Sequence, residues 1–410
     1  MRVNRQLIAV LRNPRLDRLF DVIPPLLALL LALLIASVML NLMDANPVEA
    51  FQAMADGAFG TQNATAETLV KATPLIFVGI GICIAFRGGV INIGGEGQMI
   101  VGAVAGVAVA ISFEEMSGFL LITLSLLAGF LAGALWGGLA GFLKAYFDVN
   151  EILSTIMLNQ IAVQLMNYLL NGVMLDPEVA GTNNIPKTKN IFEQAQLPQL
   201  SITLPGPVAD VFKFLGLAND PILFDRTRLH YGLVLAIVLG VITYVFLWRT
   251  SIGYRVRAVG KSQRASKFAG INVKRQTVLA MFLAGGMAGL AGVIQVLGLQ
   301  YRLQTDGSPA GFTGNAGFNG IVAALFGGLH PVGTIPASVF FGSLLVGAQK
   351  LQREIQVSSS LIITINGLIV VFMVSSQIFI RRRARRRMAL AAARGTDHED
   401  NHLLEKSEPI

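Results

Sequence analysis

Long apolar runs recur along this chain, and their length decides the class of fold. Most are close to 20 residues, and about 20 residues in a helix are enough to cross a hydrocarbon core of about 30 Å. Strands of a soluble α/β protein would be shorter, roughly 4–8 residues between turns. The alternating strands of about ten residues that a membrane barrel requires do not occur in the pattern. The sequence therefore predicts an all-α polytopic membrane protein.

We place ten hydrophobic segments, five in a first membrane half (residues 22–175) and five in a second half (residues 229–380). The predicted spans are residues 22–43, 68–86, 90–111, 119–143, 152–175, 229–248, 277–299, 316–329, 332–350 and 359–380. Segment 316–329 is short and rich in glycine. It is either a full crossing or a broken, re-entrant helix whose free backbone groups are covered by protein.

Basic residues flank the spans and set the expected orientation. The N-terminal segment 1–21, the loop 249–276 and the start of the tail 381–410 are basic, and the loop has eight bases and no acid. Ten crossings put all three on one side, which the positive-inside rule makes the cytoplasm. Segment 176–228 becomes an external loop, with a short surface helix expected at 207–217. The tail after its arginines is polar and is expected to be disordered.

Composition narrows the functional classes. The net charge is +8, but because the bases lie beside the spans, orientation explains them and no nucleic-acid partner is expected. The chain has one cysteine, Cys83, and four scattered histidines, which predicts no disulfide framework, metal centre, cofactor or catalytic residue. The "GKS" at 260–262 lacks the first glycine of a phosphate-binding loop, since position 255 is Arg. The chain is therefore not expected to be an enzyme by itself.

Two short motifs suggest an internal repeat. "NIGGEG" at 92–97 and "NAGFNG" at 315–320 both follow N-x-G-x-x-G, and each opens a hydrophobic segment. They lie five segments apart, and because five is odd, the two units point in opposite directions. Inverted repeats of this kind are typical of transporters that handle solute between the repeats.

Glycines at helical spacing predict close packing of two spans. They are Gly129, Gly133, Gly137 and Gly141 in the fourth span, and Gly285 and Gly289 in the seventh. Small residues four apart let helix backbones approach each other inside a membrane, where hydrophobicity cannot drive association.

Polar side chains within the spans are candidates for a solute pathway. The candidate residues are Asn92, Glu96, Gln98, Asn159, Asn315 and Asn319, and Gln160 and Gln164 offer further amides. Two interpretations of Glu96 are open. In the first it lines the pathway, and in the second it forms a salt bridge with Arg87 or caps a helix N-terminus. A lining of mostly uncharged hydrogen-bonding groups suits a small neutral polar solute better than an ion.

The basic loop carries its own expectation. A short helix at about 261–269 would present Arg264 and Lys267 on one face, with Gly260 and Gly270 marking its ends. Such a helix could transmit force from a docked motor domain. The alternative is a solvated basic loop that serves orientation alone.

Several stretches resemble a known family. "RAVGKSQRASKFAGI" (257–271) is similar to the coupling loop of permease subunits in bacterial ABC importers for simple sugars and nucleosides. "ATPLIFVGIGICIAFRGGVINIGGEGQ" (72–98), "VNEILSTIMLNQIA" (149–162) and "GFNGIVAALFGGLHPVG" (317–333) resemble other parts of that family, and the first two lean to its nucleoside branch. The family commonly has Asn and Ala where this chain has Ser262 and Ser266.

The resemblance implies a role and an assembly. Residues 261–269 would be the coupling helix, with contacts to an ATPase through Arg257, Gly260, Arg264, Lys267 and Gly270. A cytosolic ABC ATPase, a second and usually different permease subunit, and an extracytoplasmic substrate-binding protein would complete a multi-pass importer in the bacterial inner membrane. Two alternatives stay open: an ion-coupled secondary transporter that uses Glu96, and a membrane scaffold without flux.

Overall fold

The computed structural model describes residues 14–179, 185–203, 222–305 and 308–355, and short helical pieces between 364 and 376. The chain divides into two compact units. One holds Met1–Pro47 and Val357–Ile410, and the other holds Val48–Gln356. The described part of the first unit contains the helix α2 (Pro14–Asn41) and the pieces at 364–376. The predicted tail 381–410 lies outside the described residues.

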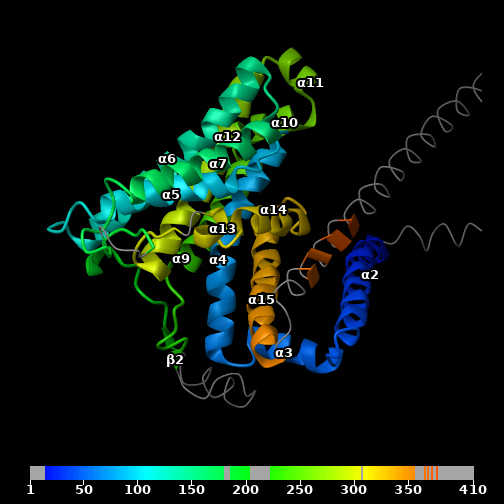
Figure 1. The fold of residues 1–410 in the computed structure, drawn as a ribbon. Helices are drawn as coiled ribbons and strands as arrows, with labels where there is room; N and C mark the ends of the chain where they lie inside the picture. Colours follow the sequence, from blue (N-terminus) through cyan, green and yellow to red (C-terminus); the bar gives the residue numbers. More distant parts are fainter. Residues whose placement is uncertain are drawn as a thin grey trace, which may run out of the picture. The chain divides into compact units, whose positions relative to one another are not determined.

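The larger unit is built of helices that pack side by side and end to end (Figure 1). In chain order they are α3 (Pro47–Phe59), α4 (Gln62–Arg87), α5 (Gly95–Ala110), α6 (Gly118–Phe147), α7 (Glu151–Leu170), α9 (Gly232–Arg249), α10 (Ser251–Lys261), α11 (Gln263–Phe268), α12 (Val273–Gln295), α13 (Pro309–Thr313), α14 (Ala316–Phe326) and α15 (Pro331–Ile355). A 3-10 turn, η1 (Glu193–Ala195), and a π-helix, η2 (Val296–Gln300), complete the set of described helices.

The prediction of a polytopic membrane protein is confirmed. Among the described residues, six helices are long and apolar enough to cross a membrane: α4, α6, α7, α9, α12 extended by η2, and α15. Shorter apolar helices are α5, α14 and Leu30–Asn41 of α2. Each predicted segment up to 332–350 contains one of these helices, while 359–380 lies largely outside the described residues. The count of ten crossings and the side of each terminus stay predictions.

Two described features were not predicted, and one of them departs from the all-α expectation. Helix α3 precedes the second predicted span and was not expected, because its 13 residues are too few to cross a membrane and gave no span signal. Within the loop 176–228, β1 (Ile202–Thr203) pairs antiparallel with β2 (Ile222–Leu223), so the loop contains a very short ribbon. The surface helix expected at 207–217 lies outside the described residues.

The first part of the long loop is docked onto the bundle. Backbone hydrogen bonds of 2.8 Å run from Thr188 N to Leu303 O, from Ile191 N to Tyr301 O and from Leu197 N to Leu297 O. The loop therefore follows the chain that leaves α12. It closes that end of the helix rather than extending freely, because its backbone groups are satisfied by the bundle.

The predicted glycine stripes of α6 and α12 face each other, which confirms their packing role. A Cβ added at Gly133 would lie 2.5 Å from Gly285 O and 2.7 Å from Gly289 Cα. Gly102 of α5 meets the backbone of Gly289 as closely. Because no side chain separates these backbones, α5, α6 and α12 form the tightly packed centre of the unit.

Candidate functional site

The two N-x-G-x-x-G motifs meet inside the larger unit. Gly95 opens α5 and Gly317 lies in the first turn of α14, and a Cβ at Gly95 would be 3.2 Å from Gly317 Cα. The Phe318 N–H donates to Glu96 Oε1 across the junction, at 3.2 Å. Helix α14 has 11 residues, so it extends about 16 Å, half the thickness of a hydrocarbon core. The junction therefore joins the N-termini of two short helices.

Three predicted pathway residues form what we call the paired amide cluster: Asn92, Gln98 and Asn159. Asn92 and Gln98 exchange two side-chain hydrogen bonds of 3.0 Å, and Asn92 Oδ1 also accepts the Gly94 N–H at 2.9 Å. Asn159, on α7, accepts the Gly97 N–H at 2.9 Å and donates to Ile93 O at 3.0 Å. All three side chains are buried. They satisfy the backbone groups that the start of α5 leaves free.

Glu96 performs the corresponding task for the other short helix. Its side chain is buried, it accepts the Phe318 N–H in the first turn of α14, and the Thr313 hydroxyl lies beside it. A carboxylate is favourable at the positive end of a helix. The sequence also allowed a salt bridge between Glu96 and Arg87. This salt bridge is not formed among the described residues, and the Arg87 Nε donates to Leu329 O at 3.0 Å. Glu96 thus caps a helix, and that helix is α14 rather than its own.

The remaining predicted pathway residues do not join this cluster. Asn315 is exposed, with a left-handed backbone (φ 61°) where α14 begins, and Asn319 is half-buried one turn later. Gln160 and Gln164 lie on the exposed face of α7. The structure therefore brings the buried side chains of Asn92, Glu96, Gln98 and Asn159 together at one junction. Asn315 lies at the start of α14 but is exposed, and Asn319, Gln160 and Gln164 do not belong to the buried group.

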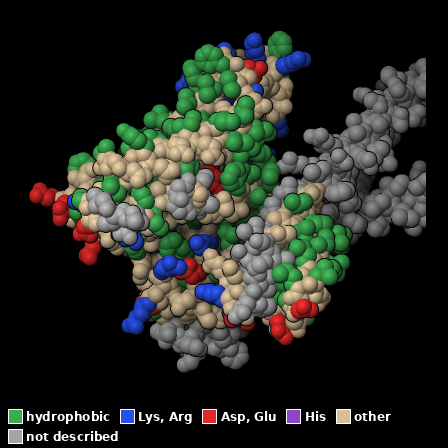
Figure 2. Space-filling view, viewed as in Figure 1, with side chains coloured by type: hydrophobic (Ala, Val, Ile, Leu, Met, Phe, Trp, Pro, Cys, Tyr) green, Lys and Arg blue, Asp and Glu red, His purple; other side chains and the backbone are tan. Residues whose placement is uncertain are grey.

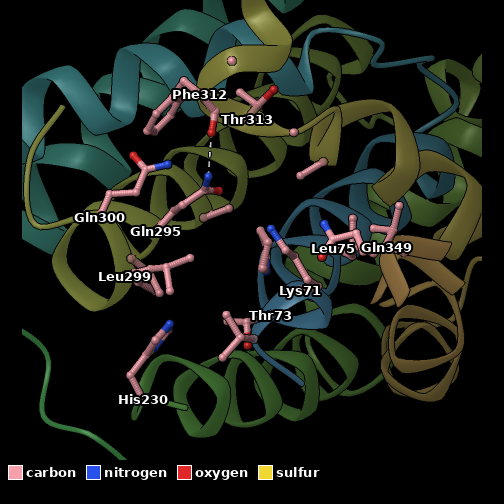
Figure 3. A pocket seen from close by; sticks show the side chains of 18 residues that line it. Lys71, Thr73, Leu75, His230, Gln295, Leu299, Gln300, Phe312, Thr313 and Gln349 are labelled. Atoms are coloured by element: carbon pink, nitrogen blue, oxygen red, sulfur yellow. Dashed lines mark hydrogen bonds between the residues drawn. The ribbon is translucent and has the colours of Figure 1, made fainter. Parts of the chain in front are cut away.

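A cavity of about 360 Å³ lies beside the junction, between α4, α12 with η2, α13, the start of α14, and α15 (Figure 3). None of the predicted pathway residues lines it. Its polar lining is Lys71, Thr73, His230, Gln295, Gln300, Thr313 and Gln349, and Phe312 contributes an aromatic ring. Lys71, Gln295 and Gln300 occur in or next to apolar runs of the sequence, so a search for polar residues at the ends of spans would have found them.

Two glutamines of this cavity carry unpaired oxygens. Gln295 Nε2 donates to Phe312 O at 2.6 Å, as Figure 3 shows, but Gln295 Oε1 is buried without a hydrogen-bond partner among the described residues. Gln300 Oε1 is buried and unpaired in the same sense. Both lie at the π-helical turn η2 that extends α12. π-Helical turns inside helices are frequent at functional sites.

The nitrogen groups of the cavity are donors. Lys71 is half-buried, and its ammonium group makes no hydrogen bond or ion pair with another described residue. His230 Nδ1 accepts the Gly232 N–H at 3.2 Å, so in the neutral ring the proton is on Nε2. Burial lowers the pKa of His230 to about 4, which keeps the ring neutral near pH 7.

The basic loop contains two helices where one was expected at 261–269. Helix α10 ends at Lys261, and Ser262 begins α11 by accepting the Ala265 N–H with its hydroxyl at 3.3 Å. Since Asn is also a good N-cap, the Ser in place of the family's Asn keeps this function. Arg264 and Lys267 of α11 are exposed, and Figure 2 shows basic side chains over the end of the unit where α10 and α11 lie.

The two predicted helix-end glycines have different roles. Gly270 has a left-handed backbone (φ 76°) and ends the turn after α11, as expected of a C-terminal glycine. Gly260 lies inside the last turn of α10, and a Cβ there would collide with Arg87 O and lie 2.8 Å from Gly89 N. Gly260 is thus a point of backbone contact between α10 and the end of α4 rather than a helix end.

A second contact, which we call the Trp248 clamp, holds α10 to the bundle through Arg87, Trp248, Arg257 and His330. The guanidinium carbons of Arg87 and Arg257 each lie 5.3 Å from the Trp248 ring centre. The His330 ring centre lies 5.0 Å from that of Trp248. Arg257 Nε also donates to Leu247 O at 2.7 Å. The clamp connects α10 with α4, α9 and the turn between α14 and α15.

These features define a class: a helical membrane protein with an internal polar cavity, two short opposed helices and a basic helix pair attached to the bundle. Residues 64–374 match the model of the family described as the permease component of the branched-chain amino acid transport system. The chain belongs to this permease family. It is accordingly a transport subunit, as the sequence predicted.

The curated relatives cover most of the chain. It is 33% identical to a guanosine ABC transporter permease protein of Bacillus subtilis, over 88% of this chain and 94% of that one. It is equally 33% identical to a glucose ABC transporter permease protein of Haloferax volcanii, over 88% of each chain. A nucleoside ABC transporter permease protein of Lactococcus lactis is 28% identical over 81% of this chain and 85% of its own length. No solved structure matches the chain.

Proposed function

We propose that this chain is the permease subunit of an ATP-driven importer of nucleosides in the bacterial inner membrane. The observation that carries the proposal is the attachment of α10 to the bundle. The backbones of Gly260 and Gly89 are in contact, and the Trp248 clamp adds two cation–π contacts. A displacement of the basic helix pair is therefore passed on to α4 and to the turn after α14.

The helix pair offers a surface for a separate ATPase. Arg264 and Lys267 are exposed on α11, and Phe268 at its end is 93% exposed. An exposed aromatic ring flanked by basic side chains suits a protein partner, because aromatic and arginine side chains supply most of the binding energy at interfaces. The ATPase would hydrolyse ATP in the cytosol and move α11. We assign Arg257 and Gly260 to the transmission of that movement and Arg264, Lys267 and Gly270 to the docking segment.

A second permease subunit would cover the exposed face of α7. Gln160 and Gln164 lie one turn apart on that face, together with apolar side chains such as Ile161 and Leu165. Amide groups are costly against lipid, and in membrane helices they pair with protein or line water. The relatives include nucleoside permeases and a glucose permease. An extracytoplasmic binding protein would deliver the solute.

The membrane arrangement follows from the same parts. We infer ten segments with both termini in the cytoplasm, the loop 176–228 outside, and the loop 249–276 inside. The contact of α5 with α14, from Gly95 to Gly317 within the two motifs, supports an inverted repeat in which α14 is a half-length, re-entrant helix. Glu96 and Asn159 satisfy the two helix starts, which makes such broken helices tolerable within a membrane.

The test is to separate uptake from ATP hydrolysis. In proteoliposomes with the ATPase, the second permease and the binding protein, nucleoside uptake should require ATP and persist without a proton gradient. Gly260→Val should lower uptake at least about tenfold while hydrolysis continues, because the new side chain pushes α10 away from α4. Ser251→Val is the matched control, since Ser251 is exposed in the first turn of the same helix. Equal uptake by the two variants would refute the transmission through α10.

A further inference from the structure

The cavity between α4, α12 and α13 has a composition that the general role of a permease does not require. Its volume of about 360 Å³ falls within the range of about 300–1,000 Å³ that is usual for small-molecule sites. Side chains from five separate elements converge on it (Figure 3).

The unpaired groups in the cavity define what a ligand must supply. The buried oxygens of Gln295 and Gln300 accept hydrogen bonds, and among the described residues nothing donates to them. Lys71 Nζ and His230 Nε2–H donate, and within the described chain Lys71 has no acceptor. A buried oxygen without a partner destabilises the protein, and a bound solute or water can remove this cost. The ligand therefore carries both donors and acceptors.

The charges in the cavity exclude two solute classes. None of the lining residues is Asp or Glu, and Lys71 adds a positive charge. Glu96 does not line the cavity and is bonded to Phe318. Glu67, one turn before Lys71 on α4, is paired with Arg228 at 2.7 Å. An ammonium group of an amino acid, or any other cation, would be buried here without a counter-charge, which is strongly unfavourable. A neutral solute fits this lining.

We propose that the chain binds its solute in this cavity, within its own helix bundle, and that the solute is a nucleoside rather than an amino acid. The base supplies N–H donors to Gln295 and Gln300 and ring or carbonyl acceptors to Lys71 and His230. The Phe312 ring, which borders the same space, provides an apolar wall for the base. This assignment rests on the proposed function, and it adds the site and the residues that select the solute.

Gln300 is the residue to change first. Its oxygen is unpaired. Gln295 also donates to Phe312 O, so replacing Gln295 would remove a contact with α13. Gln300→Leu removes the acceptor at nearly constant volume, and Gln300→Glu keeps an acceptor there. We expect the half-saturating nucleoside concentration to rise about tenfold for Gln300→Leu and for Lys71→Met, since one lost hydrogen bond is worth about 1 kcal/mol or more. Gln300→Glu should stay within about threefold of the wild type.

The matched control lies on the same helix. Gln276 is buried near the opposite end of α12, and its Oε1 is also unpaired among the described residues, but it does not line the cavity. Gln276→Leu should leave the half-saturating concentration unchanged. The comparison uses the full chain in proteoliposomes with the ATPase, second permease and binding protein. Guanosine and uridine are transported solutes, and glucose and leucine are competitors in excess.

The outcomes separate the two proposals. If the wild type takes up no nucleoside, the proposed function fails. If it takes up nucleosides, but Gln300→Leu and Lys71→Met behave like Gln276→Leu, the function stands and the cavity is not the solute site. Full competition by leucine would overturn the exclusion of amino acids, and full competition by glucose would replace the nucleoside by a sugar. Competition by nucleosides alone, together with the two site effects, supports the assignment.

Discussion

The chain buries two groups of amide side chains that differ in one respect. In the paired amide cluster, the side-chain oxygens and nitrogens of Asn92, Gln98 and Asn159 all have hydrogen-bond partners within the protein. In the cavity, the oxygens of Gln295 and Gln300 have none among the described residues. The side chains of both groups are amides, so the difference lies in their pairing rather than in their chemistry.

We propose that the difference separates a structural role from a binding role. Amides that are paired within the protein hold the start of α5 in place and have no capacity left for a solute. Amides with unpaired oxygens weaken the fold when the cavity is empty, and they recover that loss when a donor arrives. Functional sites are commonly the places where a protein departs from complete pairing.

Replacing Asn159 by Leu should have the largest effect. The change leaves the buried Gly97 N–H and Ile93 carbonyl without partners, and each loss costs about 1–3 kcal/mol. We expect the free energy of unfolding to fall by about 3 kcal/mol, with little folded protein recovered from membranes. Thermal unfolding of the purified full chain in detergent, followed by size-exclusion chromatography, measures the effect.

The neighbouring residue provides the control for that variant. Gln160→Leu replaces an exposed amide on the same turn of α7 and should unfold at the wild-type temperature. If Asn159→Leu were as stable as Gln160→Leu, while solute uptake was lost, the paired amide cluster would be part of the pathway after all. The contrast between the two amide groups would then be wrong.

The sequence predicted those features that depend on local spacing. Apolar runs placed the helices because a helix must be long and apolar to cross a membrane. The four-residue spacing of glycines predicted the contact of α6 with α12, because each of the two spans shows its own glycine-lined face in the sequence. The basic loop does lie between two apolar helices, α9 and α12, while its side of the membrane stays a prediction.

The site could not be predicted in the same way, because pairing is decided by distant parts of the chain. Asn159 and Gln300 look similar in the sequence, as amides in or at the end of apolar segments. One meets Gly97, which is 62 residues away, and the other meets no described donor. Gly260 shows the same limit. A glycine that ends a helix and a glycine that makes a backbone contact look the same in the sequence. Only the position of Gly89 against Gly260 in the structure distinguishes the two roles.

Acidification should weaken the fold through the cavity histidine. His230 lies just before α9, and burial lowers its pKa from 6.5 to about 4. Below pH 6.5 the unfolded chain therefore binds a proton at His230, whereas the folded chain does not. The free energy of unfolding falls as the pH drops from 6.5 towards 4. Between pH 7 and pH 5 the loss from this residue should be about 2 kcal/mol.

The histidine effect is measured by comparing unfolding at the two pH values. In His230→Asn the fall in unfolding temperature between pH 7 and pH 5 should become smaller, and His330, whose pKa is lowered by burial and then by the charge of Arg87, accounts for part of the remainder. Nucleoside uptake by the wild type should change little over this range, because the His230 ring stays neutral and keeps its Nε2 proton. A fall in stability of the same size in the variant would show that His230 is not buried as described.

The smallest effect is expected from Gln276, the third unpaired amide of α12 and its η2 extension. Its oxygen lies outside the cavity, so Gln276→Leu removes an unsatisfied group and nothing else; the free energy of unfolding should stay constant or rise by up to about 1 kcal/mol. Uptake should not change. This variant decides how far an unpaired oxygen identifies a solute site by itself. If Gln276→Leu reduced nucleoside affinity as strongly as Gln300→Leu, the unpaired oxygen would not be the distinguishing property. The assignment of the cavity as the solute site would then rest on Lys71 and on the shape of the cavity alone.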